Sequence, residues 1–250
     1  MRVMSAGITD VGRKRDHNED NFIVQEEMDL YVVCDGMGGH AGGEYASAIA
    51  VNTIEEALGS LSVYGASQDD DPVEIAREQL AQAVRLAGKR IHEKAATQPE
   101  LRGMGTTAVS LLLRDGNAYI AHVGDSRAYL RREGRTEQIT EDHSLIAEQM
   151  REGLLTAEEA KNHQLRNVIT RSLGFQEDVE VDVRVMALRR GDRFLLCSDG
   201  LSGYLEPVDI DGFLAAHGPM EASRRMMLEA CERGGDDNIT AVVVHIEELT

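Results

Sequence analysis

Residues 30–40 read LYVVCDGMGGH, and residues 41–50 continue as AGGEYASAIA. The first stretch begins with an apolar run that predicts a buried strand, and this run ends at Asp35 and Gly36. Helical periodicity follows over residues 42–58, where apolar side chains recur at intervals of three and four positions. The glycines between the two elements have the G-x-G-x-x-A spacing of a dinucleotide-binding turn. The stretch is therefore either a phosphate cradle built on glycines or a site built on the aspartate.

The elements after this stretch argue against a dinucleotide site. Such a site needs a strand after the first helix, with an acidic residue roughly 20 positions beyond the glycines. Here a polar loop at residues 62–72 leads into a second helical pattern over residues 73–96. Glu55 and Glu56 lie at the required distance, but inside the first helical pattern. The sequence therefore favours the interpretation in which the aspartate is the functional residue.

The order of elements along the chain predicts an α+β fold. A strand hairpin is indicated at residues 20–27 and 30–35, before the two helical patterns. Further strands are expected within residues 106–116, 117–134, 179–188, 193–199 and 239–249, and helices within 141–153 and 206–233. This order lacks βαβ alternation and indicates antiparallel sheets covered by helices. We expect a single domain over residues 1–250, with a polar, mobile insert at about 145–174.

Composition and charge argue against several classes of function. The 250 residues carry 26 basic and 44 acidic side chains, and the net charge of −18 is the wrong sign for nucleic acid or an anionic membrane. No apolar run approaches the roughly 20 residues of a membrane span, and the N-terminus lacks the apolar segment of a secretion signal. A cytoplasmic protein without nucleic-acid or membrane partners is therefore expected. Cys34, Cys197 and Cys231 fit no zinc spacing and are expected to be structural.

Acidic residues recur where the predicted strands begin or end. They lie in RDHNED (15–20), VVCDG (32–36), AHVGDSR (121–127), LLCSDG (195–200) and GGDDNIT (234–240). One Asp-Gly pair is more commonly a turn than a ligand, so the weight rests on the repetition. Strand ends at one edge of a sheet protein can converge, and hard divalent cations prefer carboxylate and carbonyl oxygens. Because no histidines or cysteines cluster at zinc spacings, Mg²⁺ or Mn²⁺ is the expected metal.

Eight segments of the chain resemble, in order, the motifs of the metal-dependent serine/threonine protein phosphatases of the type 2C (PPM) family, in their compact bacterial form. They are TDVGRKRDHNEDNF (9–22), VVCDGMGGHAGGE (32–44), MGTTA (104–108), HVGDSRAYL (122–130), TEDHS (140–144), NVITRSLG (167–174), LLCSDGL (195–201) and DNITAVVV (237–244). The resemblance implies a β-sandwich of two antiparallel sheets flanked by helices on both sides. It also implies a metal site in a cleft at one end, with the insert at about 145–174 as a flap subdomain beside it.

The resemblance assigns nine residues to the site. By this resemblance Asp35 bridges two metals, the carbonyl of Gly36 binds one of them, and Asp199 and Asp237 bind the other. Glu19 is implied to reach a metal through water, Asp20 to orient metal-bound waters, and Asp125 to bind a third metal. Arg15 matches the phosphate-binding residue, and His40 is a candidate general acid. The cofactor implied is two Mn²⁺ or Mg²⁺ ions, with a third ion as an open alternative.

Two positions depart from the family pattern. Some relatives have a histidine directly after the first Asp-Gly, whereas this chain has Met37 there and His40 three residues later. The proton donor is therefore either His40 or a metal-bound water. Many relatives also have an aspartate four positions after Asp199, where this chain has Gly203. A third metal would here rely on Asp125 and Asp199.

The implied function is hydrolysis of phosphoserine and phosphothreonine in proteins. Two metals would supply hydroxide for in-line attack on phosphorus, while Arg15 pairs with the phosphoryl oxygens. Bacterial relatives commonly oppose a serine/threonine kinase, so such a kinase is the expected partner of a chain that we expect to be a monomer. Two alternatives stay open: a metal-binding protein without catalysis, and a phosphatase of small phosphorylated metabolites. The first would be expected to lack a metal aspartate or Arg15, and all of these residues are present.

Overall fold

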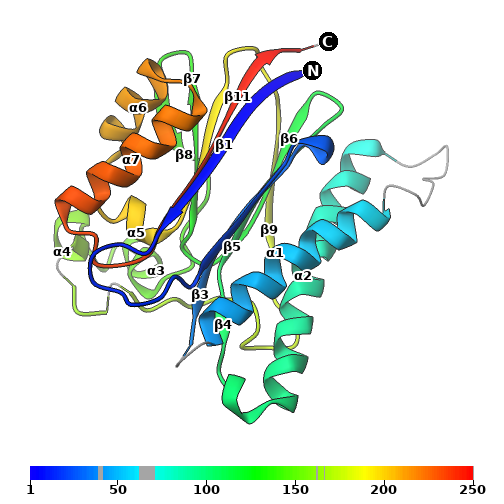
Figure 1. The fold of residues 1–250 in the computed structure, drawn as a ribbon, viewed down its shortest axis with the longest axis vertical. Helices are drawn as coiled ribbons and strands as arrows, with labels where there is room; N and C mark the ends of the chain where they lie inside the picture. Colours follow the sequence, from blue (N-terminus) through cyan, green and yellow to red (C-terminus); the bar gives the residue numbers. More distant parts are fainter. Residues whose placement is uncertain (39–41, 62–70, 162, 166, 250) are drawn as a thin grey trace.

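Two antiparallel sheets pack face to face, and helices cover the outer face of each sheet (Figure 1). The computed structural model describes residues 1–38, 42–61, 71–161, 163–165 and 167–249. This arrangement confirms the predicted α+β sandwich with helices on both sides. Among the described helices, none combines the length and the apolar character that crossing a bilayer requires.

Each sheet is built from strands that are distant in the sequence. In pairing order, the first sheet contains β1 (Arg2–Asp10), β11 (Ile239–Glu248), β10 (Arg193–Cys197), β7 (Arg127–Arg132) and β8 (Arg135–Gln138). The second contains β2 (Asp20–Gln25), β3 (Leu30–Met37), β5 (Ala108–Arg114), β6 (Asn117–Val123) and β9 (Asp182–Ala187), with the short β4 (Gly105–Thr106) paired to β3. The predicted hairpin is thus β2 and β3. The sequence did not single out β1, because Ser5, Ala6 and Gly7 interrupt its apolar pattern.

Alternation along β3 divides its side chains between two layers of the core. Leu30, Val32 and Cys34 pack into the core under the helices, whereas Tyr31 and Val33 face the other sheet. Successive side chains of a strand point to opposite faces, so a strand that is apolar at every position needs an apolar layer on each side. The unbroken run LYVVC therefore identifies β3 as a central strand, and each buried Val or Leu contributes about 1.5–3 kcal/mol.

Two pairs of helices form the outer layers. α1 (Gly42–Leu61) and α2 (Pro72–Thr97) cover the second sheet, and α6 (Pro207–Ala216) and α7 (Pro219–Arg233) cover the first (Figure 1). The expectation of one helical region over 206–233 was wrong in this detail. Pro219 has no amide hydrogen with which to continue α6, and its fixed backbone angle suits the first turn of α7. The chain is accordingly extended at His217, between the two helices.

The predicted insert contains two short helices, α3 (Leu145–Arg151) and α4 (Ala157–Lys161). Ser144 caps α3 by accepting a hydrogen bond from the Ala147 amide at 3.2 Å. Antiparallel bridges join Ser144 to Ile169 and Thr106 to Leu173. The two ends of the insert are therefore fastened to each other and to β4.

The register of the strands determines where the predicted site residues lie. Asp20, the first residue of β2, pairs with Asp35 near the end of β3. The end of β10 pairs with the starts of β7 and β11 in the other sheet. The chain next to these ends carries the remaining predicted aspartates, which are Asp125, Asp199 and Asp237. Acidic residues from five parts of the sequence thus lie at one end of the sandwich.

Candidate metal centre

The carboxyl groups at this end lie close enough to raise one another's pKa. Burial raises the pKa of Asp35 well above its ordinary value, and repulsion from Asp20, Asp199 and Asp125 adds to the effect. Burial and then Asp237 raise the pKa of Asp199. A group of ionised carboxylates in this position needs a positive charge among them. A divalent cation bound to carboxylate oxygens provides such a charge.

Asp20 is buried between the two sheets. Its Oδ2 accepts hydrogen bonds from Ser198 Oγ at 2.8 Å and from Thr240 Oγ1 at 2.6 Å. Its Oδ1 is buried and has no hydrogen-bond partner among the described residues. Burial is the main reason why the pKa of Asp20 is raised to about 7, although the two hydroxyl groups oppose the shift. A buried acceptor without a partner is costly, so Oδ1 fits a position next to an ordered water.

Thr106 of β4 and the next residue, Thr107, fix the main chain of Asp35. The Asp35 amide donates to Thr107 Oγ1 at 3.0 Å. The Asp35 carbonyl accepts from Thr106 Oγ1 at 2.8 Å and from the Thr107 amide at 2.9 Å. These contacts explain the MGTTA segment structurally: it holds the end of β3 in place, and with it the carboxyl group that the sequence singled out.

Gly36 occupies a position that no other residue could take without a shift of the backbone. A Cβ there would lie 2.1 Å from the Gly43 carbonyl oxygen and 2.5 Å from that of Glu19. The Gly36 amide also donates to the Glu19 carbonyl at 3.2 Å. The end of β3 therefore lies against both the segment before β2 and the first turn of α1. The glycine is needed for this close approach.

Asn238 holds the N-terminal loop against the start of β11, a role that the sequence analysis missed. Its Oδ1 accepts from the Glu19 amide at 2.7 Å. Its Nδ2 donates to the carbonyls of Val11 and His17 at 3.0 and 2.9 Å. The signal was present in the segment DNITAVVV, where an asparagine precedes a buried strand. This residue fixes the main chain of Glu19, whose carboxyl pKa is raised chiefly by burial.

Arg15 lies at the rim of the carboxylate group. Its Nη2 is 2.6 Å from Asp237 Oδ2, and half of its side chain is exposed. Burial acts against the charge of Arg15, but the attraction of Asp237, Glu19 and Asp35 outweighs it and the pKa is raised. The structure therefore places a cationic fork beside the predicted ligands and within reach of solvent.

Asp125 lies on the tight turn between β6 and β7. Gly124 before it has φ +106°, and a Cβ there would lie 2.6 Å from Thr107 Cγ2. Ser126 after it forms a 2.7 Å hydrogen bond between its Oγ and Thr107 Oγ1. Burial raises the pKa of Asp125 to about 7, with Asp199 as the next cause. Asp125 therefore belongs to the same group of carboxylates, at the side of Asp199.

The two departures from the family pattern have different outcomes in the structure. His40 lies outside the described residues, so its role as a proton donor stays a prediction. Gly203 ends α5 (Asp199–Ser202), and its amide donates to the Asp199 carbonyl at 2.7 Å. This position contributes main chain, and no carboxylate, near Asp199.

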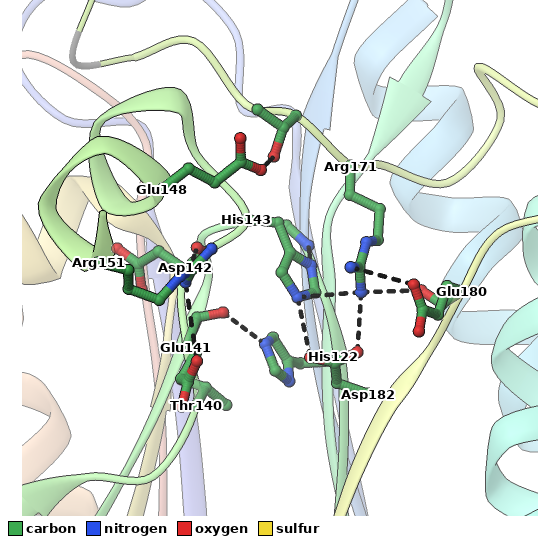
Figure 2. A network of polar contacts seen from close by, with 12 residues as sticks. His122, Thr140, Glu141, Asp142, His143, Glu148, Arg151, Arg171, Glu180 and Asp182 are labelled. Atoms are coloured by element: carbon green, nitrogen blue, oxygen red, sulfur yellow. Dashed lines mark hydrogen bonds and ion pairs between the residues drawn. The ribbon is translucent and has the colours of Figure 1, made fainter. Parts of the chain in front are cut away.

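His122, His143 and Asp182 form a second cluster of titratable groups, beside the turn that carries Asp125 (Figure 2). Their candidate ligand atoms all lie within 4.8 Å of one another. His143 Nδ1 accepts from the Gly124 amide at 3.1 Å, so the proton of the neutral ring is on Nε2. That nitrogen lies 3.2 Å from Asp182 Oδ2 and has no lone pair for a metal. Arg171 already provides a cation, 2.8 Å from Asp182 Oδ1. The carboxylate group around Asp35 is thus the better fit for Mn²⁺ or Mg²⁺.

Comparison with known proteins agrees with this geometry. The family described as protein phosphatase 2C matches residues 12–238. The serine/threonine phosphatase stp of Listeria welshimeri is 36% identical over 240 residues, which cover 94% of this chain and 93% of that protein. The serine/threonine phosphatase PstP/Ppp of Mycobacterium tuberculosis has a crystal structure with a TM-score of 0.87 and 36% identity, covering 98% of this chain and 99% of that one.

One further structure bears on the metal. The catalytic domain of PstP in complex with two manganese ions is 34% identical, with a TM-score of 0.82, and covers 98% of this chain and 99% of that one. The family match spans nearly the whole chain, and the fold is shared with the solved structures over 98% of its length. This chain therefore belongs to the protein phosphatase 2C family.

Proposed function

We propose that this chain is a metal-dependent phosphatase that hydrolyses phosphoserine and phosphothreonine in proteins. The observation that carries the proposal is the group of partly exposed carboxylates around Asp35, bordered by Arg15. Carboxylate oxygens suit Mn²⁺ or Mg²⁺, and a guanidinium group suits phosphoryl oxygens. Membership of the family supports the same chemistry.

The proposed metal ligands are the groups that converge at this end of the sandwich. They are Asp35 as the ligand shared by two ions, the carbonyl of Gly36, and the carboxylates of Asp199 and Asp237. When bound, such ions would lower the pKa of a coordinated water and so supply hydroxide near neutral pH. Glu19 and Asp20 act on surrounding waters, and the unpartnered Oδ1 of Asp20 accepts a hydrogen bond from one of them.

The proposed reaction is an in-line displacement at phosphorus. A bond forms from the water oxygen to phosphorus while the bond to the serine or threonine oxygen breaks. Arg15, held beside Asp237, pairs with the phosphoryl oxygens and orients them. The departing oxygen takes up a proton, for which His40 or an ordered water is the proposed donor.

The remaining features of the proposal concern the whole chain. Residues 1–250 act as a single phosphatase domain, in which the flap at about 145–174 influences the choice of substrate. Asp125 and Asp199 are the proposed ligands if a third ion binds, and Gly203 adds no carboxylate to them. Relatedness to bacterial serine/threonine phosphatases supports phosphorylated proteins as its substrates. The proposal further takes the protein to act as a monomer in the cytoplasm and to oppose a serine/threonine kinase.

The proposal is tested by the release of phosphate from two substrates. We expect hydrolysis of an aryl phosphate and of a phosphothreonine peptide in the presence of Mn²⁺, and loss of both activities in EDTA. Absence of Mn²⁺-dependent release from both substrates would contradict catalysis altogether. A preference for small phosphorylated metabolites over phosphopeptides by about tenfold or more in kcat/KM would instead contradict the protein substrate.

A further inference from the structure

His143, which follows Glu141 and Asp142 in the segment TEDHS, lies between the turn that carries Asp125 and the end of the flap. The His143 side chain accepts from the Gly124 amide through Nδ1, and the His143 amide donates to the Gly124 carbonyl at 2.9 Å. The His143 carbonyl accepts from the Thr170 amide at 2.8 Å. His143 therefore contacts the turn that carries Asp125 and the end of the flap at the same time.

The preceding residue holds the other end of the same turn. The carboxylate of Asp142 forms a bidentate contact with Arg127, at 3.0 Å from Nε to Oδ1 and 2.7 Å from Nη2 to Oδ2. Arg127 begins β7, two residues after Asp125. Asp142 and His143 thus hold Asp125 from both sides, through Arg127 and Gly124.

The ring of His143 is itself fixed by two charged residues. Its Nε2–H donates to Asp182 Oδ2 at 3.2 Å, and Arg171 Nη1 binds Asp182 Oδ1 at 2.8 Å (Figure 2). The same Arg171 Nη1 lies 3.2 Å from His143 Nε2, so the guanidinium group also contacts the ring directly. The ring also stacks on His122, with the ring centroids 4.6 Å apart. Asp182 and His122 are paired residues of β9 and β6, so they anchor the ring to the second sheet.

The flap enters this arrangement through Arg171. The antiparallel bridge between Ser144 and Ile169 closes the base of the insert. Two residues after Ile169, Arg171 leaves the flap and binds Asp182, and Leu173 then joins Thr106 of β4. Any change in the position of the flap's C-terminal end therefore moves Arg171 relative to both Asp182 and the ring of His143.

We propose that His143 is a positioning residue for Asp125, and that Arg171, through Asp182 and its own contact with His143, couples the C-terminal end of the flap to the turn that carries Asp125. The coupling rests on the proposed function only in that Asp125 is taken to be a metal ligand. The structural part of the proposal concerns contacts between described residues and holds in the protein without metal. A substrate that shifts the flap would thereby change the position of Asp125, and an ion bound at Asp125 would restrict the flap.

The test uses Arg171→Met, with Arg171→Lys as the conservative variant. The matched control is Arg132→Met. Arg132 ends β7 of the first sheet, has a similar exposure, and forms a bidentate pair with the buried Asp192, which lies just before β10. Amide hydrogen exchange at Gly124 is measured by NMR in EDTA, and Mn²⁺ binding is measured by calorimetry. Neither readout depends on the activity of the metal-loaded enzyme.

In Arg171→Met we expect exchange at the Gly124 amide to rise by about tenfold or more, together with exchange in the flap, and Mn²⁺ binding to weaken by about threefold or more. In Arg171→Lys, which keeps the charge but not the fork, both values should return to within about threefold of the wild type. In Arg132→Met the stability should fall while exchange at Gly124 stays at the wild-type value. Asp182→Asn should reproduce Arg171→Met and serves in its place if that variant does not fold.

Faster exchange in the flap alone, with Gly124 unchanged in Arg171→Met and in Asp182→Asn, would overturn the coupling. Equal acceleration at Gly124 in Arg132→Met would also overturn it, because the effect would then be general destabilisation. The exchange measurement is independent of catalysis. An inactive wild-type protein would contradict the proposed function and leave the result at Gly124 interpretable.

Discussion

The carboxylate group around Asp35 and the network of His143, His122, Asp182 and Arg171 are neighbouring regions that differ in how their charges are balanced. Both collect charged side chains from distant parts of the chain at one end of the sandwich. In the network each carboxylate has a cationic or hydrogen-bonding partner, as Asp182 has in Arg171 and His143. In the carboxylate group, Asp35 is repelled by Asp20, Asp199 and Asp125, and the hydrogen-bond partners of Asp20 are two neutral hydroxyl groups.

The directions of the pKa shifts express this difference. Burial raises the pKa of Asp35 and of Asp20, and neighbouring carboxylates raise it further, although two hydroxyl groups oppose the shift at Asp20. Burial also acts to raise the pKa of Asp182, but the hydrogen bonds from Arg171 and His143 outweigh it, and the pKa is lowered. A region whose charges are already matched needs no ligand, whereas a region with an excess of one sign is adapted to receive an opposite charge. Charge matching, rather than the number of candidate ligands, separates the metal centre from the network.

The largest expected effect follows from Asp35→Asn. The amide keeps the shape of the side chain but removes the charge proposed to lie between two ions. We expect kcat/KM for an aryl phosphate with Mn²⁺ to fall by about three orders of magnitude, which corresponds to about 4 kcal/mol of transition-state stabilisation. Initial rates over a range of Mn²⁺ concentrations check this. Asp211→Asn, a carboxylate remote from the centre that binds Arg131, is the control and should keep the wild-type rate. A wild-type rate for Asp35→Asn would contradict the bridging role.

A smaller effect is expected for Arg15→Met. The side chain is half exposed and lies at the rim, so its loss should leave folding and metal binding nearly intact. Loss of a bidentate partner of the phosphoryl group should lower kcat/KM by roughly 100-fold, largely through KM, and Arg15→Lys should recover only part of it. Steady-state kinetics with a phosphothreonine peptide make this measurement. An unchanged KM in Arg15→Met, with Mn²⁺ binding also unchanged, would remove Arg15 from the substrate site.

Much of the fold and of the metal centre could be predicted from the sequence, because the relevant signals are local. The apolar run before Asp35 identifies a central strand, and the Asp-Gly pairs mark the ends of β3 and β10. Helix boundaries at α1 and α2 agree with the predicted ranges to within three residues at each end, as the periodicity of the apolar face allows.

The features that the sequence did not reveal depend on contacts between distant segments. In the sequence, Asn238 is typical of a turn before a strand. Only the structure shows that its side-chain amide binds the carbonyls of both Val11 and His17. His143 and Asp182 are 39 positions apart, and their contact depends on the pairing of β9 with β6. No periodicity or motif spacing encodes such a contact. The tautomer of His143 likewise follows only from the Gly124 amide beside it.

A comparison of two acid-to-amide substitutions in the metal-free protein tests charge matching directly. Asp35→Asn removes a carboxyl group that others repel, so we expect it to raise the free energy of unfolding by roughly 1–2 kcal/mol in EDTA near pH 7.5. Asp182→Asn leaves Arg171 and His143 without their acceptor and should lower it by roughly 1–2 kcal/mol. Urea unfolding at one pH measures both. Shifts of the same sign in the two variants would contradict the contrast between the regions.

The last expected effect concerns how the free energy of unfolding depends on pH under acidic conditions. Burial, with further contributions from His122 and Arg171, lowers the pKa of His143 to about 4, against about 6.5 for an unperturbed histidine. The folded protein then binds fewer protons than the unfolded chain between these values, so this residue's contribution to stability falls as the pH drops from about 6.5 to about 4. His143→Gln should flatten the dependence of the unfolding free energy on pH by about 1–2 kcal/mol over that range.

Urea unfolding at a series of pH values in EDTA provides the measurement. The carboxylates of the metal centre bind protons in the same range, so the prediction concerns the difference between variant and wild type. His245 is a matched control, because burial also lowers its pKa to about 4 while it lies outside the network, on β11. His245→Gln should flatten the curve by a similar amount and leave exchange at Gly124 unchanged, whereas His143→Gln should alter both. A His143→Gln curve parallel to the wild type would show that the ring takes up protons freely, against the tautomer that the Gly124 amide imposes.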